Sequence, residues 1–90
     1  MGEKLLRRTK YEIWVEILEV CLNEPHHQSW ILKELSLKTD LVKKSIAFLL
    51  ERNLLIEIID EEDKWTAYRT TMKGKEALSH FYQLMTNFFS

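Results

Sequence analysis

The stretch that most constrains this chain runs from residue 37 to residue 53, where a short turn precedes a helix with one apolar face. Val42, Ile46 and Leu49 recur at helical spacing, and Leu50 widens the same stripe. The charged residues of this helix fall on its other faces: Asp40, Lys43, Lys44 and Glu51. The apolar stripe must therefore lie in a core, and the opposite stripe is free to contact another molecule.

Both ends of this helix carry local signals. Thr39 is the expected N-cap, because its hydroxyl can accept a hydrogen bond from the exposed amides of the first turn. Asn53 suits the left-handed conformation that ends many helices. Residues 36–38 then form the turn that separates this helix from the one before it.

Two helices are expected earlier in the chain. The first spans residues 8–22, with glutamates on one face and an inward face made of Ile13, Trp14, Ile17, Leu18 and Cys21. Pro25 stops it, because proline has no amide hydrogen and disfavours helical geometry in the residue before it. The second helix spans residues 26–35, with Gln28 or Ser29 near its N-cap and an inward face made of Trp30, Ile31 and Leu35.

Two runs rich in β-branched and aromatic residues follow the third helix, at residues 54–59 and 65–69. Alternation along them places Leu55 or Ile56 inward, opposite Trp65, Ala67 or Arg69. The order helix, turn, helix, hairpin is that of a winged helix-turn-helix. We therefore predict a mainly α fold with a small β-hairpin, of the α+β class, followed by a long C-terminal helix.

The last helix begins after residue 71 and runs to about residue 89, and its apolar residues arrive in adjacent pairs. Such a band is too wide for one contact, since a helix packed on its own domain needs only one stripe. We predict a winged helix-turn-helix domain at residues 1–71 and a dimerisation helix at 72–90, which together form one structural unit. The homodimer interface comprises Ala77, Leu78, Phe81, Leu84, Met85 and Phe88. The alternative is a tail that packs on the first helix of its own chain.

The bulk properties exclude several classes of protein. A chain of 90 residues with 46% apolar content is one small ordered domain. No apolar run approaches the roughly 20 residues of a membrane span, and the sequence starts without the apolar segment of a signal peptide. A soluble cytoplasmic protein without a membrane partner is expected. Cys21 is the only cysteine, and a buried inert thiol is favoured over a reactive one.

Residue types that carry catalysis or bind metals are sparse. The only glycines are Gly2 and Gly74, so the chain has no glycine-rich phosphate loop. His26 and His27 are adjacent and point apart on any regular element, so two solvated histidines are favoured over a metal or redox site with Cys21. We predict that the chain is not an enzyme and uses no metal or other cofactor.

Positive charges cluster although the formal net charge is −1. Lys33 and Lys38 flank the turn, and Lys43 and Lys44 project from the first half of the third helix. A second group stands at the start of the first helix: Arg7, Arg8 and Lys10. Phosphate contacts need such a one-sided patch, and amides at a helix N-terminus can add another contact. The alternative is an ordinary solvated lysine face.

A DNA major groove would meet Thr39, Asp40, Lys43 and Lys44. This face carries no arginine, asparagine or glutamine, the residues that make strong bidentate base contacts. Binding of double-stranded DNA through this face is therefore expected to read sequence only modestly.

Three segments resemble a known family: residues 7–13 (RRTKYEI), 48–56 (FLLERNLLI) and 68–76 (YRTTMKGKE). They are similar to an archaeal family of small winged-helix DNA-binding proteins. In that family one long C-terminal helix pairs antiparallel, as a coiled coil, with its partner in a dimer. The resemblance covers the chain from Arg7 to the end. It implies double-stranded DNA binding, either as a local transcription regulator or as an abundant protein of the chromatin or nucleoid.

The chain departs from the family pattern at Thr70, where a leucine is usual, at Met72, where a polar residue is usual, and at Lys38, where a serine cap is usual. The hairpin tip is also acidic, with four carboxylates that only Lys64 offsets: Asp60, Glu61, Glu62 and Asp63. Coulomb repulsion there opposes docking on a duplex. An alternative function follows, in which the acidic tip and the aromatic tail engage a protein partner and DNA is not bound.

Overall fold

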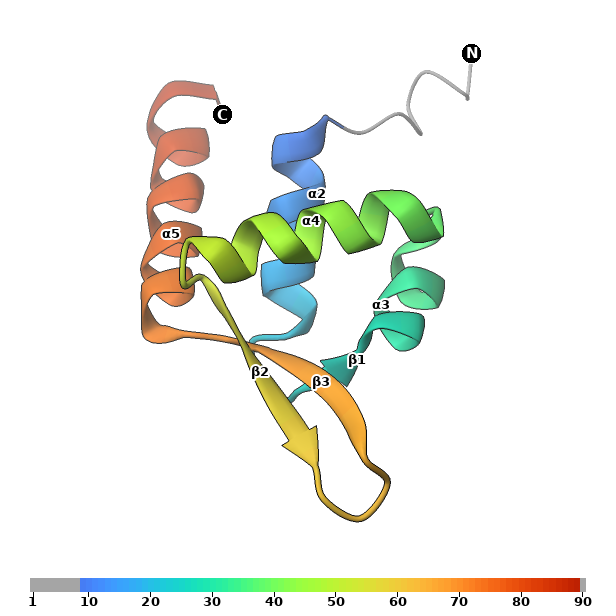
Figure 1. Cartoon of the computed structure of the whole chain (residues 1–90). Coiled ribbons are helices and arrows are strands. Elements are labelled where there is room, and N and C mark those ends of the chain that lie inside the picture. The colour runs from blue at the N-terminus through green and yellow to red at the C-terminus, as the bar shows by residue number, and fades with distance from the viewer. Residues whose placement is uncertain (1–8, 90) are drawn as a thin grey trace.

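The computed structural model describes residues 9–89 (Figure 1). Within this range the elements, in chain order, are α2 (Lys10–Val20), β1 (His26–His27), α3 (Gln28–Leu35), α4 (Thr39–Glu51), β2 (Leu55–Asp60), β3 (Trp65–Thr70), α5 (Met72–Leu84) and the π-helical turn η1 (Met85–Phe89). The predicted α+β class and the predicted order of helix, turn, helix and hairpin are both confirmed.

The helices pack around one core, and the hairpin projects from it. Helix α4 crosses in front of α2, α5 runs beside α2, and the β2–β3 hairpin extends away from all of them (Figure 1). The buried cluster combines residues of these helices with one residue of β2: Ile13, Ile17, Leu18, Cys21, Ile31, Val42, Ile46, Leu49, Leu55 and Leu78. The predicted apolar stripes of α2 and α4 are therefore the stripes that form the core.

Helix α2 begins two residues later than predicted, at a capping box. Thr9 is the N-cap, and its hydroxyl accepts a hydrogen bond from the Glu12 amide at 3.1 Å. The Glu12 carboxylate accepts from the Thr9 amide in return, at 2.8 Å. This exchange satisfies two amides that the start of a helix leaves without partners. Arg7 and Arg8 lie outside the described residues.

The predicted start of the second helix is wrong, because His26 and His27 form strand β1. His26 pairs with Tyr68 and His27 with Ala67, in an antiparallel sheet of order β1-β3-β2. The N-cap of α3 is consequently His27, without a side-chain cap, and neither Gln28 nor Ser29 serves as one. Backbone pairing with β3 decides this assignment, and helical periodicity within residues 26–35 could not predict it.

The inward position predicted for Trp30 is also wrong. Its side chain is 37% exposed and stacks on the His26 ring, with centroids 3.4 Å apart and planes 7° apart. Ile31 fills the core position of α3 instead, and Leu35 packs against the core. The strand places His26 where it covers one face of the indole, so this tryptophan is partly shielded from water without entering the core.

The cap predicted for α4 is one residue too late. Lys38 is the N-cap, without a side-chain cap, and Thr39 is the first helical residue. Ser36 closes α3 in the left-handed conformation with φ of 55°, and the Leu37 amide donates to the Leu32 carbonyl at 3.0 Å. Leu37 then packs against the core just before the N-cap, as the outer residue of a hydrophobic staple does. Burial of Leu37 therefore fixes where α4 begins, and the Thr39 hydroxyl does not.

The structure shows which hairpin residues point inward, a choice that the alternation of apolar and polar residues left open. Leu55 is buried and Ile56 is exposed, while on β3 Ala67 is buried and both Trp65 and Arg69 are exposed. In register, Leu55 pairs with Thr70 and Ile58 with Ala67. Asn53 has φ of 63°, which confirms the left-handed residue predicted after α4.

Two threonines at the end of β3 join four parts of the chain. The Thr70 hydroxyl donates to the Leu18 carbonyl of α2 at 2.7 Å, in a buried hydrogen bond. The Thr71 hydroxyl donates to the Asn53 carbonyl at 2.6 Å and accepts from the Gly74 amide at 3.0 Å, as the N-cap of α5. The start of α5 is thus held against the ends of α2 and α4.

Gly74 allows this close approach. A Cβ atom at Gly74 would lie 2.4 Å from the Leu54 carbonyl oxygen and 2.6 Å from the Thr70 methyl carbon. Real Cβ atoms do not approach backbone oxygen so closely, and the Leu54 carbonyl is also the acceptor for the Thr71 amide, at 3.1 Å.

We expect Gly74→Ala to destabilise the fold although alanine is the better helix former. The backbone of residue 54 must move to admit the methyl group, and overpacking of this kind costs roughly 1–3 kcal/mol, more than the roughly 1 kcal/mol that the helix gains. Urea unfolding measures the change. Ser79→Ala, at an exposed position of the same helix, is the control and should stay within about 0.5 kcal/mol of the original. Equal stability of both variants would contradict the close contact.

Helix α5 also packs on α2 through side chains. Leu78 is buried in the shared core, and the Tyr82 hydroxyl donates to the Glu19 carboxylate. Burial of the hydroxyl, the hydrogen bond to Glu19 and the negative charge of Glu19 raise the pKa of Tyr82 to about 12. The folded state therefore favours the protonated phenol, and this contribution to stability is complete below pH 10 and is lost as the pH rises through 12.

We expect Glu19→Gln to lower the pKa of Tyr82 from about 12 toward 10, because the negative charge disappears while the burial remains. Ultraviolet absorption of tyrosinate, titrated from pH 9 to pH 13, measures this change, and Tyr82→Phe identifies the signal by removing it. Glu24→Gln is the control, since Glu24 is exposed and precedes β1. An unchanged titration in Glu19→Gln would mean that the two side chains do not meet in solution.

Candidate nucleic-acid interface

Helix α4 separates its buried and exposed residues cleanly. The residues directed into the protein are Val42, Ser45, Ile46 and Leu49. The exposed residues at its start, with the N-cap, are Lys38, Thr39, Asp40, Lys43 and Lys44. Because residues three and four apart share one face of a helix, these side chains form one continuous surface. We refer to these five residues as the α4 face.

The α4 face combines positive side chains with open backbone amides. Neither Lys43 nor Lys44 pairs with a carboxylate within residues 9–89. The N-cap residue Lys38 makes no side-chain hydrogen bond to the amides of the first turn of α4. Such amides, together with the positive end of the helix dipole, favour an anion such as phosphate. Asp40 lies in the same turn and is the one acidic group of the face.

Of the other predicted basic residues, Lys33 lies at the end of α3 and Lys10 at the start of α2. Lys33 is exposed in the last turn of α3, one short turn before Lys38. The Lys10 ammonium lies 5.5 Å from the centroid of the Tyr11 ring and 5.9 Å from that of Trp14. Trp14 in turn contacts Phe48 of α4, so the start of α2 lies against the second half of that helix. The predicted contribution of Arg7 and Arg8 falls outside the described residues.

An aromatic stack that periodicity did not predict connects α2 with α4. The rings of Trp14 and Phe48 are parallel within 4°, with centroids 3.8 Å apart. The Arg52 guanidinium carbon lies 3.7 Å from the Phe48 centroid, so Phe48 is enclosed between the indole and the guanidinium. Phe48 and Arg52 are four residues apart on one helix, and this spacing could have indicated the contact between them. It could not have indicated the contact with Trp14. The Arg52 guanidinium also pairs with the Glu51 carboxylate at 3.5 Å, so the C-terminal end of α4 carries an ion pair beside the stack.

The acidic tip of the hairpin is a structured turn in which one carboxylate has an internal role. An Asp60 carboxylate oxygen accepts from the amides of Glu62 at 3.0 Å and Asp63 at 3.3 Å. Lys64 has φ of 61°, and its amide donates to the Asp60 carbonyl. Asp60 therefore stabilises the loop. The remaining carboxylates, of Glu61, Glu62 and Asp63, are exposed and accept no hydrogen bond from the other described residues.

The cysteine and the histidines lie in separate structural settings. Cys21 is buried, and burial raises the pKa of its thiol to about 12, which disfavours the reactive thiolate. The His27 Nδ1 atom lies 3.1 Å from the Thr66 carbonyl oxygen, and its ring contacts Trp65. Over residues 9–89 no group of three or more potential ligands could hold a metal ion. In the same range no helix is both long and apolar enough to cross a membrane.

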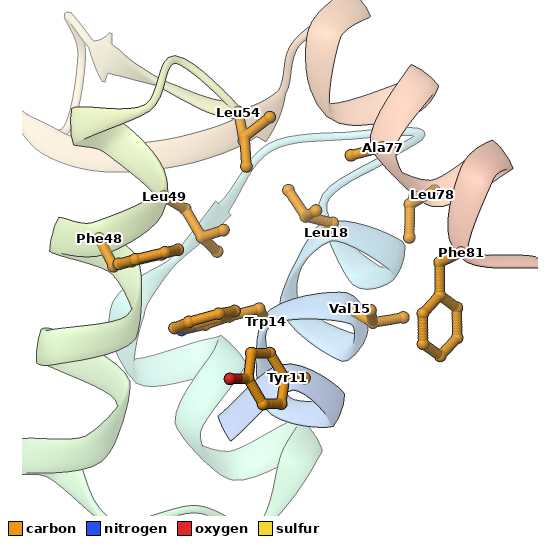
Figure 2. A pocket seen from close by; sticks show the side chains of 10 residues that line it. All are labelled: Tyr11, Trp14, Val15, Leu18, Phe48, Leu49, Leu54, Ala77, Leu78 and Phe81. Atoms are coloured by element: carbon orange, nitrogen blue, oxygen red, sulfur yellow. The ribbon is translucent and has the colours of Figure 1, made fainter. Parts of the chain in front are cut away.

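An apolar pocket lies on the side of the protein where α2, α4 and α5 meet (Figure 2). Its volume is about 220 Å³, and it is lined by Tyr11, Trp14, Val15, Leu18, Phe48, Leu49, Leu54, Ala77, Leu78 and Phe81. Three of these residues, Leu18, Leu49 and Leu78, are buried and form its floor. Tyr11 is exposed at the rim, so the pocket opens beside the start of α2.

The predicted dimer residues occupy two different environments. Leu78 is only 3% exposed and belongs to the core of its own chain, while Ala77 and Phe81 are half-buried in the pocket wall. Leu84, Met85 and Phe88 are exposed, and Phe89 is exposed beside them. The face of α5 that carries Leu78 packs on α2, as the alternative of an intramolecular tail requires. Within residues 9–89, nothing covers the apolar residues beyond it.

The fold and the exposed α4 face together define a winged helix-turn-helix protein, in which the β2–β3 hairpin is the wing. The chain belongs to the winged helix-turn-helix family, whose model matches residues 7–87. Among curated proteins, no significant match to the chain exists.

Solved transcription regulators share the fold at low sequence identity. The chain is similar to the transcriptional regulator BldR from Sulfolobus solfataricus, with a TM-score of 0.77 and 18% identity over 84% of this chain and 55% of that one. It is also similar to a PadR family transcription regulator from Clostridium difficile R20291, with a TM-score of 0.76 and 18% identity over 82% of this chain and 86% of that one. For a point mutant of S. aureus MepR the TM-score is 0.74 and the identity 16%, over 93% of this chain and 62% of that one. The chain thus spans little more than half the length of BldR.

Proposed function

We propose that this chain is a dimeric protein that binds double-stranded DNA and regulates transcription or organises chromatin. The observation that carries the proposal is the α4 face, where two lysines without an ion-pair partner among the described residues share one exposed surface with the open first turn of a helix. In a helix-turn-helix protein the second helix of the motif is the element that enters the major groove. Helix α4 has that position here, after α3 and the turn at Ser36.

Phosphate contacts supply most of the affinity in this proposal. Lys33, Lys38, Lys43 and Lys44 all stand at or beside the α4 face, and ammonium groups contact phosphates without distinguishing bases. Asp40 is the one side chain of the face that can accept from cytosine, and Thr39 can contact any base. Binding is therefore general, with a modest sequence preference. The transcription regulators that share this fold support the role.

The homodimer rests on the exposed end of α5 and η1. Leu84, Met85, Phe88 and Phe89 form an apolar surface that the other described residues of the chain do not cover. A second copy can cover it by a two-fold arrangement in which the same surface contacts itself. The long C-terminal helix of the archaeal winged-helix family that the sequence resembles would pair in this way.

A protein-interaction module is the second candidate, and the wing favours it. The wing exposes Ile56, Ile59 and Trp65 beside the carboxylates of its tip. An apolar surface bordered by negative charge suits a basic protein partner better than a phosphate backbone. The salt dependence of duplex binding distinguishes the two candidates, because an interaction module makes no phosphate contacts that salt could weaken.

We expect Lys43→Ala with Lys44→Ala to weaken binding to all duplex sequences and to reduce the salt dependence. Removal of each phosphate contact changes the slope of log affinity against log salt by about 0.9. Fluorescence anisotropy with a labelled duplex at several salt concentrations measures both effects. Lys73→Ala with Lys75→Ala is the matched control, since these exposed lysines lie on α5. If both pairs behave alike, α4 is not the recognition helix.

We expect Glu61→Lys with Glu62→Lys to tighten nonspecific duplex binding, most strongly at low salt where screening is weakest. These two carboxylates repel phosphate, whereas Asp60 must be kept because it holds the turn. Glu24→Lys with Glu76→Lys makes the same change of net charge at exposed positions outside the wing, and anisotropy compares the two variants. Weaker binding by the wing variant alone would show that the carboxylates are needed for docking.

A further inference from the structure

We propose that Phe88 of one chain fills the apolar pocket between α2, α4 and α5 of a second copy. The inference rests on the proposed dimer and specifies which surfaces meet in it. Two features carry it: a pocket that the side chains of residues 9–89 leave open, and an aromatic helix end that the same residues leave uncovered.

The pocket has the size and chemistry for one phenyl ring. Apart from the Tyr11 hydroxyl and the Trp14 indole nitrogen, its lining side chains are hydrocarbon. Its volume of about 220 Å³ exceeds the roughly 150 Å³ of an apolar cavity that accepts benzene. An unfilled apolar cavity forfeits dispersion contacts with the atoms around it, so an occupant gains free energy by entering.

Phe88 cannot reach the pocket of its own chain. It lies seven residues beyond Phe81, which forms part of the pocket wall, so the two side chains are about 10 Å apart along the axis at a rise of 1.5 Å per residue. The chain is helical throughout this interval. Phe88 is 73% exposed, and a second chain is needed to bring it to a pocket.

The sequence of α5 and η1 provides a register for that second chain. In an antiparallel pair with two-fold symmetry, if one residue contacts another, the reverse contact must also occur. An axis between Leu84 and Met85 places Leu84 of each chain opposite Met85 of the other. The same axis places Phe81 opposite Phe88. Since these four residues follow helical spacing of three, four and seven, every contact along this stripe is apolar.

Phe81 links the register to the pocket. It is both a residue of the α5 stripe and part of the pocket wall, and in Figure 2 its ring lies at the edge of the cavity on the α5 side. A Phe88 ring that meets Phe81 therefore arrives at the opening near Tyr11. The polar residues of α5 and η1 lie on the opposite side of the helix, where they stay in water: Glu76, His80, Gln83 and Asn87.

The surface available is adequate for a dimer. A fully buried aromatic side chain covers about 150–250 Å². On that scale the exposed parts of Tyr11, Tyr82, Phe88 and Phe89, with Leu84 and Met85, offer roughly 700 Å² per chain. Stable interfaces bury about 800 Å² on each partner.

The test begins with the full chain and its oligomeric state, measured by analytical ultracentrifugation. In a dimer prepared from one ¹³C-labelled and one unlabelled chain, isotope-filtered NMR should show contacts between the Phe88 ring and the methyl groups of Val15 and Leu54 of the other chain. A monomeric chain would overturn both the dimer and this inference. A dimer without these contacts would overturn only the inference, as would pocket contacts from Leu5 or Leu6 of the same chain.

Variants provide an independent measurement. Phe88→Ala should raise the dimer dissociation constant by roughly thirtyfold or more, as truncation of a residue that anchors an interface does. Asn87→Ala, exposed on the opposite side of the same turn, is the control and should change it by less than about threefold. Ala77→Phe places a ring of the same chain in the pocket. It should raise the dimer dissociation constant as much as Phe88→Ala does. Adding Phe88→Ala to Ala77→Phe should then have little further effect, whereas fully additive effects would overturn the inference.

Benzene serves as a probe of the pocket itself. The unmodified dimer should not bind benzene there, because the Phe88 ring already occupies the cavity. The Phe88→Ala variant should bind it, with chemical-shift changes at Val15 and Leu54. Binding of benzene to the unmodified dimer at these residues would show an empty pocket and overturn the inference.

Discussion

The hydrogen bonds of Thr70 and Thr71 are the contacts on which the arrangement of this protein depends. They fasten the end of β3 to the carbonyl groups of Leu18 and Asn53, and they start α5 at the same point. The Thr70 amide adds a bond to the Cys21 carbonyl at 3.0 Å. Because these bonds satisfy backbone groups where α2 and α4 end, they fix the direction in which α5 leaves the domain. The absence of a side chain at Gly74 is the steric condition for this junction.

That junction places α5 against α2 and leaves the pocket between them and α4. The Trp14 and Phe48 rings stack across the same region, so the α4 helix is in contact with the pocket through Phe48 and Leu49. The helix that carries the proposed recognition surface therefore also lines the pocket that the proposed dimer would fill. Whatever fills the pocket constrains how α4 is held relative to α5, because close-packed interiors transmit displacement.

Charge is distributed so that a nearly neutral chain presents two opposite surfaces. The α4 face is predominantly positive, with Asp40 as its one carboxylate, and the wing tip presents three outward carboxylates. On a duplex the first surface is attracted and the second is repelled, and at physiological ionic strength each acts over about 8 Å. If the wing is held away from the DNA backbone, its exposed Trp65 and Ile59 side chains remain available for another contact. This separation explains why the net charge of −1 says little about the partner.

Features that depend on local chemistry and periodicity could be predicted from the residues alone. The stripe of Val42, Ile46 and Leu49 identified the core face of α4 and therefore its exposed face, because only one register of an amphipathic helix buries its apolar side chains. Asn53 marked the end of α4, since few residues accept a positive φ. The same local reasoning identified the hairpin and the order of the elements.

Features that depend on distant partners were settled only by the packing of the folded chain. His26 became a strand because β3 offers it backbone hydrogen bonds, and Trp30 stayed at the surface because that strand brings His26 over it. Lys38 became the N-cap because Leu37 is drawn to the core. The Phe48 stack and the pocket join residues of helices far apart in sequence, and no periodicity within one helix specifies which face of another it meets. Local propensity is compatible with several arrangements of these residues, and packing between elements determines which of them forms.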